Sequence, residues 1–420
     1  MLLRLIILVA VLLLIDLYGW RGLRSLFSLP RLRPYRKLVF RAYWIMDVAF
    51  IVFGITWAMI IRNSQWPDYV QYRNYFYITG AFVLIFLPKF TFLVFVILYD
   101  IQLLVLRLFR LLTEKTAFYK PFEKNGQRRF LPITGFILSV FMFGWVLYGV
   151  AWGRFNFKVE EVEVRIEGLP SSFEGYRLVH FSDTHLGSFA RTRPVERGLR
   201  KIEELKPDAV MFSGDLVNNQ AKEAKKFVPY FRSIQTPDGM FSVLGNHDMG
   251  DYRRWYTIEE KEANLLLLEL LNEQMGFHLL RNEHAFITRG EDSLMVIGVD
   301  NWGLPPFSQY GDLEKALGEY RDFPLQVLIS HDPSHWREEV IPDSNIRLTL
   351  SGHTHAMQFG FRTPFFKWSP SALIYPEWSG LYRENEQKLY VNRGFGFLGF
   401  PGRIGMPPEI TLIVLRNAGS

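Results

Sequence analysis

The most informative feature of this chain is a set of five short segments: SDTHLG at residues 182–187, SGDLVNN at 213–219, LGNHD at 244–248, ISHDP at 329–333 and SGHTHAMQ at 351–358. Each segment follows an apolar run and carries a side chain that can bind a metal ion or transfer a proton. Five of the nine histidines lie inside these segments. Open α/β sheets place their functional side chains at such positions, because loops converge just past the C-terminal ends of the strands.

The residues around these segments predict a mixed α/β domain with a two-sided core. Strands are expected at 176–183, 208–215, 240–246, 294–300, 326–332, 346–353 and 409–415, with an edge strand and turn in 158–170. Helices are expected near 194–205, 221–233 and 263–275. The segment NWGLPPFSQY, residues 301–310, is a candidate lining for the opening of a substrate site.

The residue types favour a site for two divalent metal ions. Two cations roughly 3.5 to 4 Å apart can hold a phosphoryl group and activate a water between them, and their mutual repulsion calls for a shared anionic ligand. Asp215 is the natural candidate for that bridge. Because the chain has no cysteine, the ligands are imidazole and carboxylate, which suit Mn, Fe, Zn or Co, with Mn favoured.

The order and content of the five segments resemble the calcineurin-like metallophosphoesterase family, in a membrane-anchored bacterial form, whose pattern is D-x-H, GD, GNH[DE], H and GHxH. The match covers about residues 176–358, with a similar tail to 415. The resemblance implies a four-layer α/β/β/α sandwich. It also implies a ligand set: Asp183, His185 and His355 for the first metal, Asn246, His331 and His353 for the second, and Asp215 between them. His247 would be the general acid, with Asp248 orienting it.

One position departs from the pattern of many bacterial relatives, which have GHTHGGQ. Here Ala356 and Met357 replace the two glycines. Glycines let the backbone come near a substrate, so the change bears on the substrate and leaves the metal ligands intact. Singly, each segment is more often a turn or helix cap than a site. Together, and in family order, they favour the metal site. His180 alternates within its strand and is expected in the core, and three further histidines, His278, His284 and His335, lack metal-like spacing.

Charge divides the chain into two parts. Residues 1–153 contain 18 Lys and Arg against 6 Asp and Glu, a net charge of +12, whereas residues 154–420 contain 30 against 36, a net charge of −6. We therefore expect a transmembrane region at 1–153 and a phosphoesterase domain at 154–420. A nuclease would show a basic face for the phosphate backbone, so the acidic second part argues against nucleic acid as a partner.

The first part contains four apolar stretches, at about residues 2–20, 43–61, 77–101 and 133–152. Each is near the length of about 20 residues that crosses a bilayer as a helix. The third contains Pro88 and Lys89, so a kink is expected, and the lysine needs a carboxylate such as Asp47 or Asp100. A cleaved signal peptide is the alternative for the first stretch, but it lacks an obvious cleavage site.

Orientation follows from the loops between these stretches. Seven Lys and Arg lie between the first and second stretches and seven more between the third and fourth, whereas residues 62–75 contain Arg62, Asp68 and Arg73. The positive-inside rule places the two basic loops in the cytoplasm and the second part of the chain outside. The basic loops can also contact membrane lipids.

These observations predict a multi-pass membrane enzyme that hydrolyses a phosphoester or pyrophosphate bond, with a lipid-linked substrate favoured by proximity to the membrane. The alternative is a membrane sensor or transporter that uses the fold to bind a phosphorylated ligand without turnover. The aromatic residues of RGFGFLGFPGRIG, residues 393–405, are either buried or part of a flexible apolar loop near the membrane.

Overall fold

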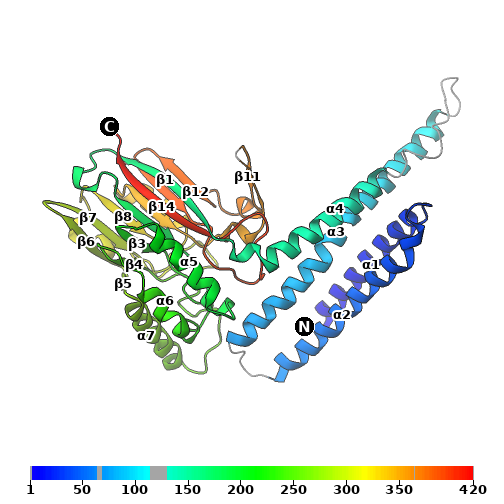
Figure 1. Cartoon of the computed structure of the whole chain (residues 1–420), viewed down its shortest axis with the longest axis horizontal. Coiled ribbons are helices and arrows are strands. Elements are labelled where there is room, and N and C mark those ends of the chain that lie inside the picture. The colour runs from blue at the N-terminus through cyan, green and yellow to red at the C-terminus, as the bar shows by residue number, and fades with distance from the viewer. Residues whose placement is uncertain (1, 64–68, 114–129, 364, 420) are drawn as a thin grey trace. The chain divides into compact units, whose positions relative to one another are not determined.

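The computed structural model describes residues 2–63, 69–113, 130–363 and 365–419 (Figure 1). These residues form two compact units, Met1–Gln65 with Ile78–Tyr148, and Trp66–Tyr77 with Gly149–Ser420. The main segment of the second unit thus begins at Gly149, whereas the sequence places the domain boundary between residues 153 and 154. Most of the second basic loop, residues 114–129, lies outside the described residues, as do residues 64–68.

In the part of the N-terminal region that the structure describes there are four long helices, and each covers all or nearly all of one predicted apolar stretch. They are α1 (Leu2–Leu26), α2 (Arg36–Asn63), α3 (Tyr69–Thr113) and α4 (Phe130–Ala151). Among the described residues, two segments are long and apolar enough to cross a membrane: Val70–Phe109 and Phe130–Phe155. Helix α3 continues through Pro88 and is longer than predicted.

Lys89, in the middle of α3, is neutralised inside the first unit by two carboxylates. Its ammonium group donates to Asp16 at 2.9 Å and also to Asp47, and both carboxylates are buried. Asp47 is therefore a partner, as predicted, and Asp16 is a partner that the sequence did not indicate. The other predicted candidate, Asp100, contacts Tyr18 instead. It lies eleven residues further along the same helix, about 16 Å along the axis, and cannot reach the lysine.

The second unit contains two six-stranded sheets. The first has the order β1 (Lys158–Ile166), β14 (Glu409–Asn417), β2 (Arg177–Phe181), β3 (Ala209–Phe212), β4 (Met240–Ser242) and β5 (Phe277–Leu279). The second has the order β12 (Gly380–Glu384), β13 (Gln387–Val391), β9 (Leu348–Ser351), β8 (Gln326–Ile329), β7 (Asp292–Gly298) and β6 (Glu283–Arg289). β10 (Phe361–Arg362) and β11 (Lys367–Trp368) form a separate hairpin. The predicted strands are all present, and β1 is an edge strand, as predicted.

Helices cover the outer face of each sheet, which gives the expected four-layer α/β/β/α arrangement. The first sheet is covered by α5 (Arg193–Glu204), α6 (Val228–Arg232) and α7 (Ile258–Met275) (Figure 1). The second is covered by α8 (Leu313–Leu317) and by the turn of helix that precedes α9 (Ile341–Asp343). One apolar cluster fills the space between the two sheets, and one lies under each helical layer.

The aromatic residues near the end of the chain are part of this core. Phe395 and Phe397 are buried in the cluster between the first sheet and its helices. Phe395 packs against Phe157 and Phe181, with ring centroids 4.4 and 5.9 Å away. Of the two interpretations that the sequence left open, burial is therefore correct for these two side chains.

Candidate metal centre

The candidate ligands lie in the loops that follow the parallel strands of both sheets. Asp183 follows β2, Asp215 follows β3, Asn246 follows β4, His331 follows β8, and His353 follows β9. Because these strands run in one direction within each sheet, their C-terminal ends bring the loops to one edge. The fold thus assembles side chains that are up to 172 positions apart, from Asp183 to His355.

Five of the seven predicted ligands have a left-handed backbone. They are Asp183, His185, Asp215, His353 and His355, with φ between 44° and 67°. This conformation costs about 1 to 2 kcal/mol for a residue with a side chain, so it persists only where the surroundings fix it. Ala356 and Met357 continue the left-handed run with φ of 48° and 46°, at the positions where many relatives have glycine.

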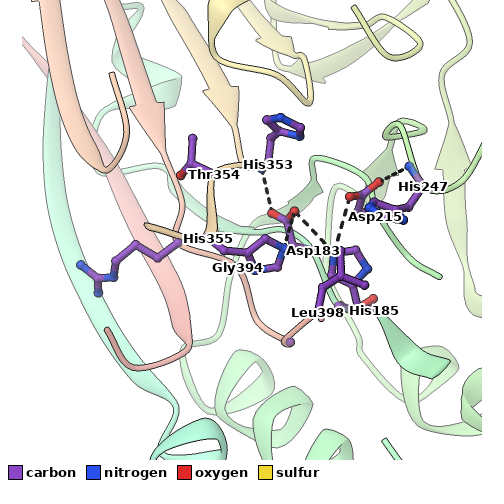
Figure 2. Close-up of polar contacts among 12 residues, drawn as sticks. Asp183, His185, Asp215, His247, His353, Thr354, His355, Gly394 and Leu398 are labelled. Carbon is purple, nitrogen blue, oxygen red and sulfur yellow. Dashed lines mark hydrogen bonds and ion pairs between the residues drawn. The ribbon is translucent and has the colours of Figure 1, made fainter. Parts of the chain in front are cut away.

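The side-chain donor atoms converge on one small volume (Figure 2). His355 Nε2 lies 3.0 Å from His185 Nε2 and 3.3 Å from Asp183 Oδ1. Asp215 Oδ2 lies 3.5 Å from His185 Nε2 and 3.3 Å from His331 Nε2. Two groups therefore have donor atoms close enough for one ion each, Asp183 with His185 and His355, and Asp183 with Asp215 and His331.

Two of these donor atoms make no hydrogen bond within the part of the protein that the structure describes, although other candidate ligands lie close to them. Within the described residues, Asp183 Oδ1 and His331 Nε2 are buried and accept or donate no hydrogen bond. Buried polar atoms are rarely left in this state. His331 Nδ1 donates to the carbonyl of Ser213 at 2.7 Å, so Nε2 is the ring atom that faces the aspartates. Burial lowers the pKa of His331, but Asp215 and Asp183 raise it to about 10, so a metal would take the place of the proton on Nε2. The donor set of imidazole and carboxylate fits Mn, Fe, Zn or Co.

The charges at the site favour ionised aspartates. Burial raises the pKa of Asp183, but His355, His331 and His185 together hold it well below its usual range. Burial likewise raises the pKa of Asp215, and His331 and His247 more than offset the effect. Burial lowers the pKa of His185, which keeps its ring neutral. The carboxylates and this imidazole are therefore in the protonation states that bind cations.

Asn246 and His353 lie next to each other, and His353 also lies beside His331. Asn246 Oδ1 is 3.0 Å from His353 Nδ1, and the His331 and His353 ring centroids are 5.2 Å apart. His353 Nε2 is 2.8 Å from the hydroxyl of Tyr375 and 3.6 Å from Asp332 Oδ2. The structure thus brings all three residues proposed for the second metal into one group.

His247 lies beside the candidate ligands and lines the cavity above them. Its Nδ1 donates to the carbonyl of Asn218 at 2.7 Å, which leaves Nε2 on the opposite side of the ring. Its backbone N–H donates to Asp215 Oδ1 at 2.9 Å. Burial lowers the pKa of the ring.

Asp248 occupies a different place from the one predicted. Its carboxylate accepts hydrogen bonds from the backbone N–H groups of Asp215, Val217 and Gly245, at 2.7, 3.1 and 3.0 Å. It therefore fixes the loop that presents Asp215 and His247, whereas the ring of His247 is held by the carbonyl of Asn218. The sequence suggested a contact with the ring because the two residues are neighbours in GNHD.

A cavity of about 710 Å³ opens above the site. Its polar lining includes four of the predicted ligands and His247, together with the charged residues Arg337, Glu338 and Glu377. Its other walls are mainly apolar and include Leu304, Pro306, Phe307, Met357, Ile374 and Leu398. Three of these belong to the segment 301–310, which therefore lines the cavity as predicted.

Two supporting residues were not predicted from the sequence. Arg403 is buried, its guanidinium donates to the carbonyls of Arg393 and Gly394 at 2.7 and 3.0 Å, and its Nη2 lies 3.1 Å from His355 Nδ1. Burial lowers the pKa of Arg403 to about 9. Tyr375 contacts His353, as described above. Neither residue lies in one of the five segments. Asp332, in contrast, directly follows His331 in ISHDP, and this position could have indicated that it lies near the site.

The fold and this site have the features expected of the two-sheet, metal-dependent phosphoesterases, and comparison with known proteins agrees with this class. Residues 176–357 match the family model described as calcineurin-like phosphoesterase. Residues 3–154, which contain α1 to α4, match the model described as probable calcineurin-like phosphoesterase, transmembrane domain. The chain belongs to the calcineurin-like phosphoesterase family, in the form that has an N-terminal transmembrane domain.

Three relatives show how far the similarity extends. A zebrafish (Danio rerio) transmembrane protein with metallophosphoesterase domain is 33% identical over 65% of this chain, and the match spans 60% of that protein. The uncharacterized metallophosphoesterase YkuE of Bacillus subtilis is 28% identical over 64% of this chain and 90% of its own. An uncharacterized metallophosphoesterase of Helicobacter pylori is 26% identical over 96% of both chains. The similarity thus includes a bacterial protein that matches across both parts of the chain.

Proposed function

We propose that this chain is a multi-pass membrane enzyme that hydrolyses a phosphoester or pyrophosphate bond with two divalent metal ions. The convergence of carboxylate and imidazole donor atoms from Asp183, His185, Asp215, His331 and His355 carries the proposal. Bound ions would supply positive charge to the phosphoryl group and an activated water. Asn246 and His353 would complete the ligands of the second ion, Asp215 would be shared by both ions, and Mn is favoured.

The protein's own side chains then have distinct tasks. Asn246 Nδ2 donates to the hydroxyl of Tyr252 at 2.8 Å, which fixes the direction of its amide oxygen. His247 is anchored through Nδ1, which donates to the carbonyl of Asn218, so it acts as the acid only when Nε2 carries a second proton. That imidazolium would give its Nε2 proton to the leaving oxygen of a substrate in the cavity and return to the neutral ring. Asp248 holds both loops in register. The general acid is therefore positioned by backbone groups.

The apolar cavity walls support a substrate with an apolar group attached to its phosphate. Met357 is partly exposed in the cavity and keeps a left-handed backbone that a glycine would adopt at less cost. A side chain retained there against strain is a reason to assign it a contact with substrate. The net negative charge of residues 154–420 disfavours nucleic acid. A lipid-linked phosphoester or pyrophosphate fits both observations.

The proposal predicts turnover by the full-length protein. After loading with Mn, it should release phosphate or a phosphorylated headgroup from lipid-linked substrates faster than from nucleotide-linked or simple soluble phosphoesters. Products are identified by mass spectrometry, with the metal-free protein as the control. Saturable binding of these compounds without any product would contradict the enzyme and favour the alternative, a sensor or transporter module.

The orientation of the enzyme is a second prediction. We expect residues 154–420 outside the cytoplasm, because the positive-inside rule places the two basic loops in the cytoplasm and one predicted span follows the second of them. The chain has no cysteine, so single replacements can be labelled selectively. A membrane-impermeant maleimide applied to intact cells should label Ile258→Cys, at a side chain that is 73% exposed, and should label Tyr35→Cys only after permeabilisation. The reverse pattern would place the enzyme in the cytoplasm.

A further inference from the structure

The second unit exposes a group of large apolar side chains outside its core. Phe365 is 98% exposed, Phe366 60%, Leu373 79% and Ile374 62%. We call these four residues the apolar rim. They lie in and just after the β10–β11 hairpin, which stands away from the two six-stranded sheets (Figure 1). Soluble proteins seldom expose several large apolar side chains together unless a partner covers them.

The hairpin begins next to the end of a candidate membrane span. Helix α4 is part of the span Phe130–Phe155, and its residues from Gly149 onward belong to the second unit. The carbonyl of Gly149 accepts from Arg403 N at 3.2 Å, and the carbonyl of Ile404 accepts from Gly360 N at 2.9 Å. β10 starts at the next residue. Within the second unit, two adjacent residues, 403 and 404, therefore connect the start of the hairpin with Gly149, near the end of the candidate span.

The charged side chains of the hairpin are already paired within the protein. Arg362 Nη2 donates to Glu160 Oε2 at 2.9 Å, and Lys367 Nζ donates to the carbonyl of Ser379 at 2.7 Å. Burial lowers the pKa of Lys367. Neither cation is thus directed to an anionic headgroup, and the contact surface is the apolar rim itself. Hydrocarbon at the edge of a bilayer is the partner that such a surface fits.

The apolar rim also continues into the cavity of the metal centre. Ile374 belongs to the rim and lines the cavity, and Tyr375, the next residue, contacts His353. Met357, which precedes the hairpin, lines the same cavity. Ile374 is therefore the rim residue that is both exposed at the surface and part of the cavity wall.

We propose that the apolar rim inserts into the bilayer interface near the point where the candidate span Phe130–Phe155 ends, and opens the cavity toward the lipid. An amphiphilic phosphoester would then reach the metal centre from the membrane without crossing water. Insertion is independent of the proposed function, whereas this route for the substrate rests on it.

Insertion is tested with the full-length protein in phosphatidylcholine nanodiscs. Phe365→Cys and Leu373→Cys are each labelled with an environment-sensitive fluorophore, and spin-labelled acyl chains serve as quencher. We expect blue-shifted, strongly quenched emission at both positions. The matched control is Ile258→Cys on α7, an apolar residue 73% exposed, which should stay unquenched. Unquenched emission at 365 and 373 would overturn the proposal, whether each probe is exposed to water or is shielded from water by the protein.

The substrate route has its own test. Phe365 and Phe366 do not line the cavity, so the double variant Phe365→Ser, Phe366→Ser should turn over a water-soluble phosphoester at the parent rate. Its turnover of a lipid-embedded phosphoester should fall severalfold. Equal rates for parent and variant on the embedded substrate would refute the route. The fluorescence readout needs no turnover, so a failure of the proposed function would not be mistaken for a failure of insertion.

Discussion

Replacing Asp215 with asparagine should remove bound metal and phosphoesterase activity together. The Oδ2 atom lies 3.5 Å from His185 Nε2 and 3.3 Å from His331 Nε2, so it faces both candidate ion positions. Asparagine keeps the shape and the oxygen but loses the negative charge that offsets the repulsion of two cations. Metal ions supply several kcal/mol of transition-state stabilisation, and turnover should therefore fall on the order of 10³-fold. Metal per chain and turnover are measured on the same sample.

A matched replacement separates this effect from a general loss of stability. Asp300 is equally buried and is paired with Arg281 at 2.8 Å, away from the candidate ligands. Asp300→Asn should weaken the fold yet leave the metal content per folded chain unchanged. An Asp215→Asn protein that retains two ions per chain and turns over normally would show that this carboxylate does not bridge.

The sequence was sufficient for the parts of this molecule that depend on local pattern. Alternating apolar residues predicted the strands, and the five segments predicted that the candidate ligands follow the C-terminal ends of these strands. Asp183 and His355 then had to meet, because the strands before them run parallel within each sheet and the two sheets pack together. The residue types at the ends of the strands are therefore sufficient to predict which side chains lie near one another at the site.

The sequence was not sufficient where a contact depends on residues far apart in the chain. Arg403 lies 48 positions from His355, and Tyr375 lies 22 positions from His353. Nothing in their local sequence distinguishes them from other arginines and tyrosines. Asp16, the second partner of Lys89, was missed for the same reason. The placement of Asp248 was predicted only in part, because adjacency in GNHD does not say whether its carboxylate binds a ring or the backbone.

Backbone strain connects these supports with the site. Left-handed residues such as Asp183 and His355 are stable only where neighbouring groups define their geometry. Gly394 lies against both, and a Cβ at that position would lie 2.9 Å from His355 Nδ1 and 3.0 Å from Asp183 Cβ. Arg403, with its bonds to the carbonyls around this glycine, closes the same region. Gly394 and Arg403, which the sequence did not single out, thus help to keep the predicted ligands in place.

Replacing His247 with alanine should leave both metal ions in place and impair catalysis according to the leaving group. The ring is anchored through Nδ1 to the carbonyl of Asn218, and the proposed ligands fill both ion positions without it. A proton donor contributes about 10² to 10⁴ in rate when the leaving group is a poor one, such as an alkoxide. Nitrophenolate is a weak base and needs little protonation. Activity on alkyl phosphoesters should therefore fall in that range, and activity on nitrophenyl esters should fall much less.

His284→Ala is the matched control for this experiment. His284 is also half-buried, and its Nδ1 also donates to a backbone carbonyl, that of Ala316, at 2.7 Å. Both variants lose one such hydrogen bond, which contributes about 1 kcal/mol to stability, so they should unfold alike. Only His247→Ala should lose much more activity on alkyl phosphoesters than on nitrophenyl esters. Equal losses on both substrates with intact metal would show that His247 positions the phosphate, and loss of metal would make it a ligand.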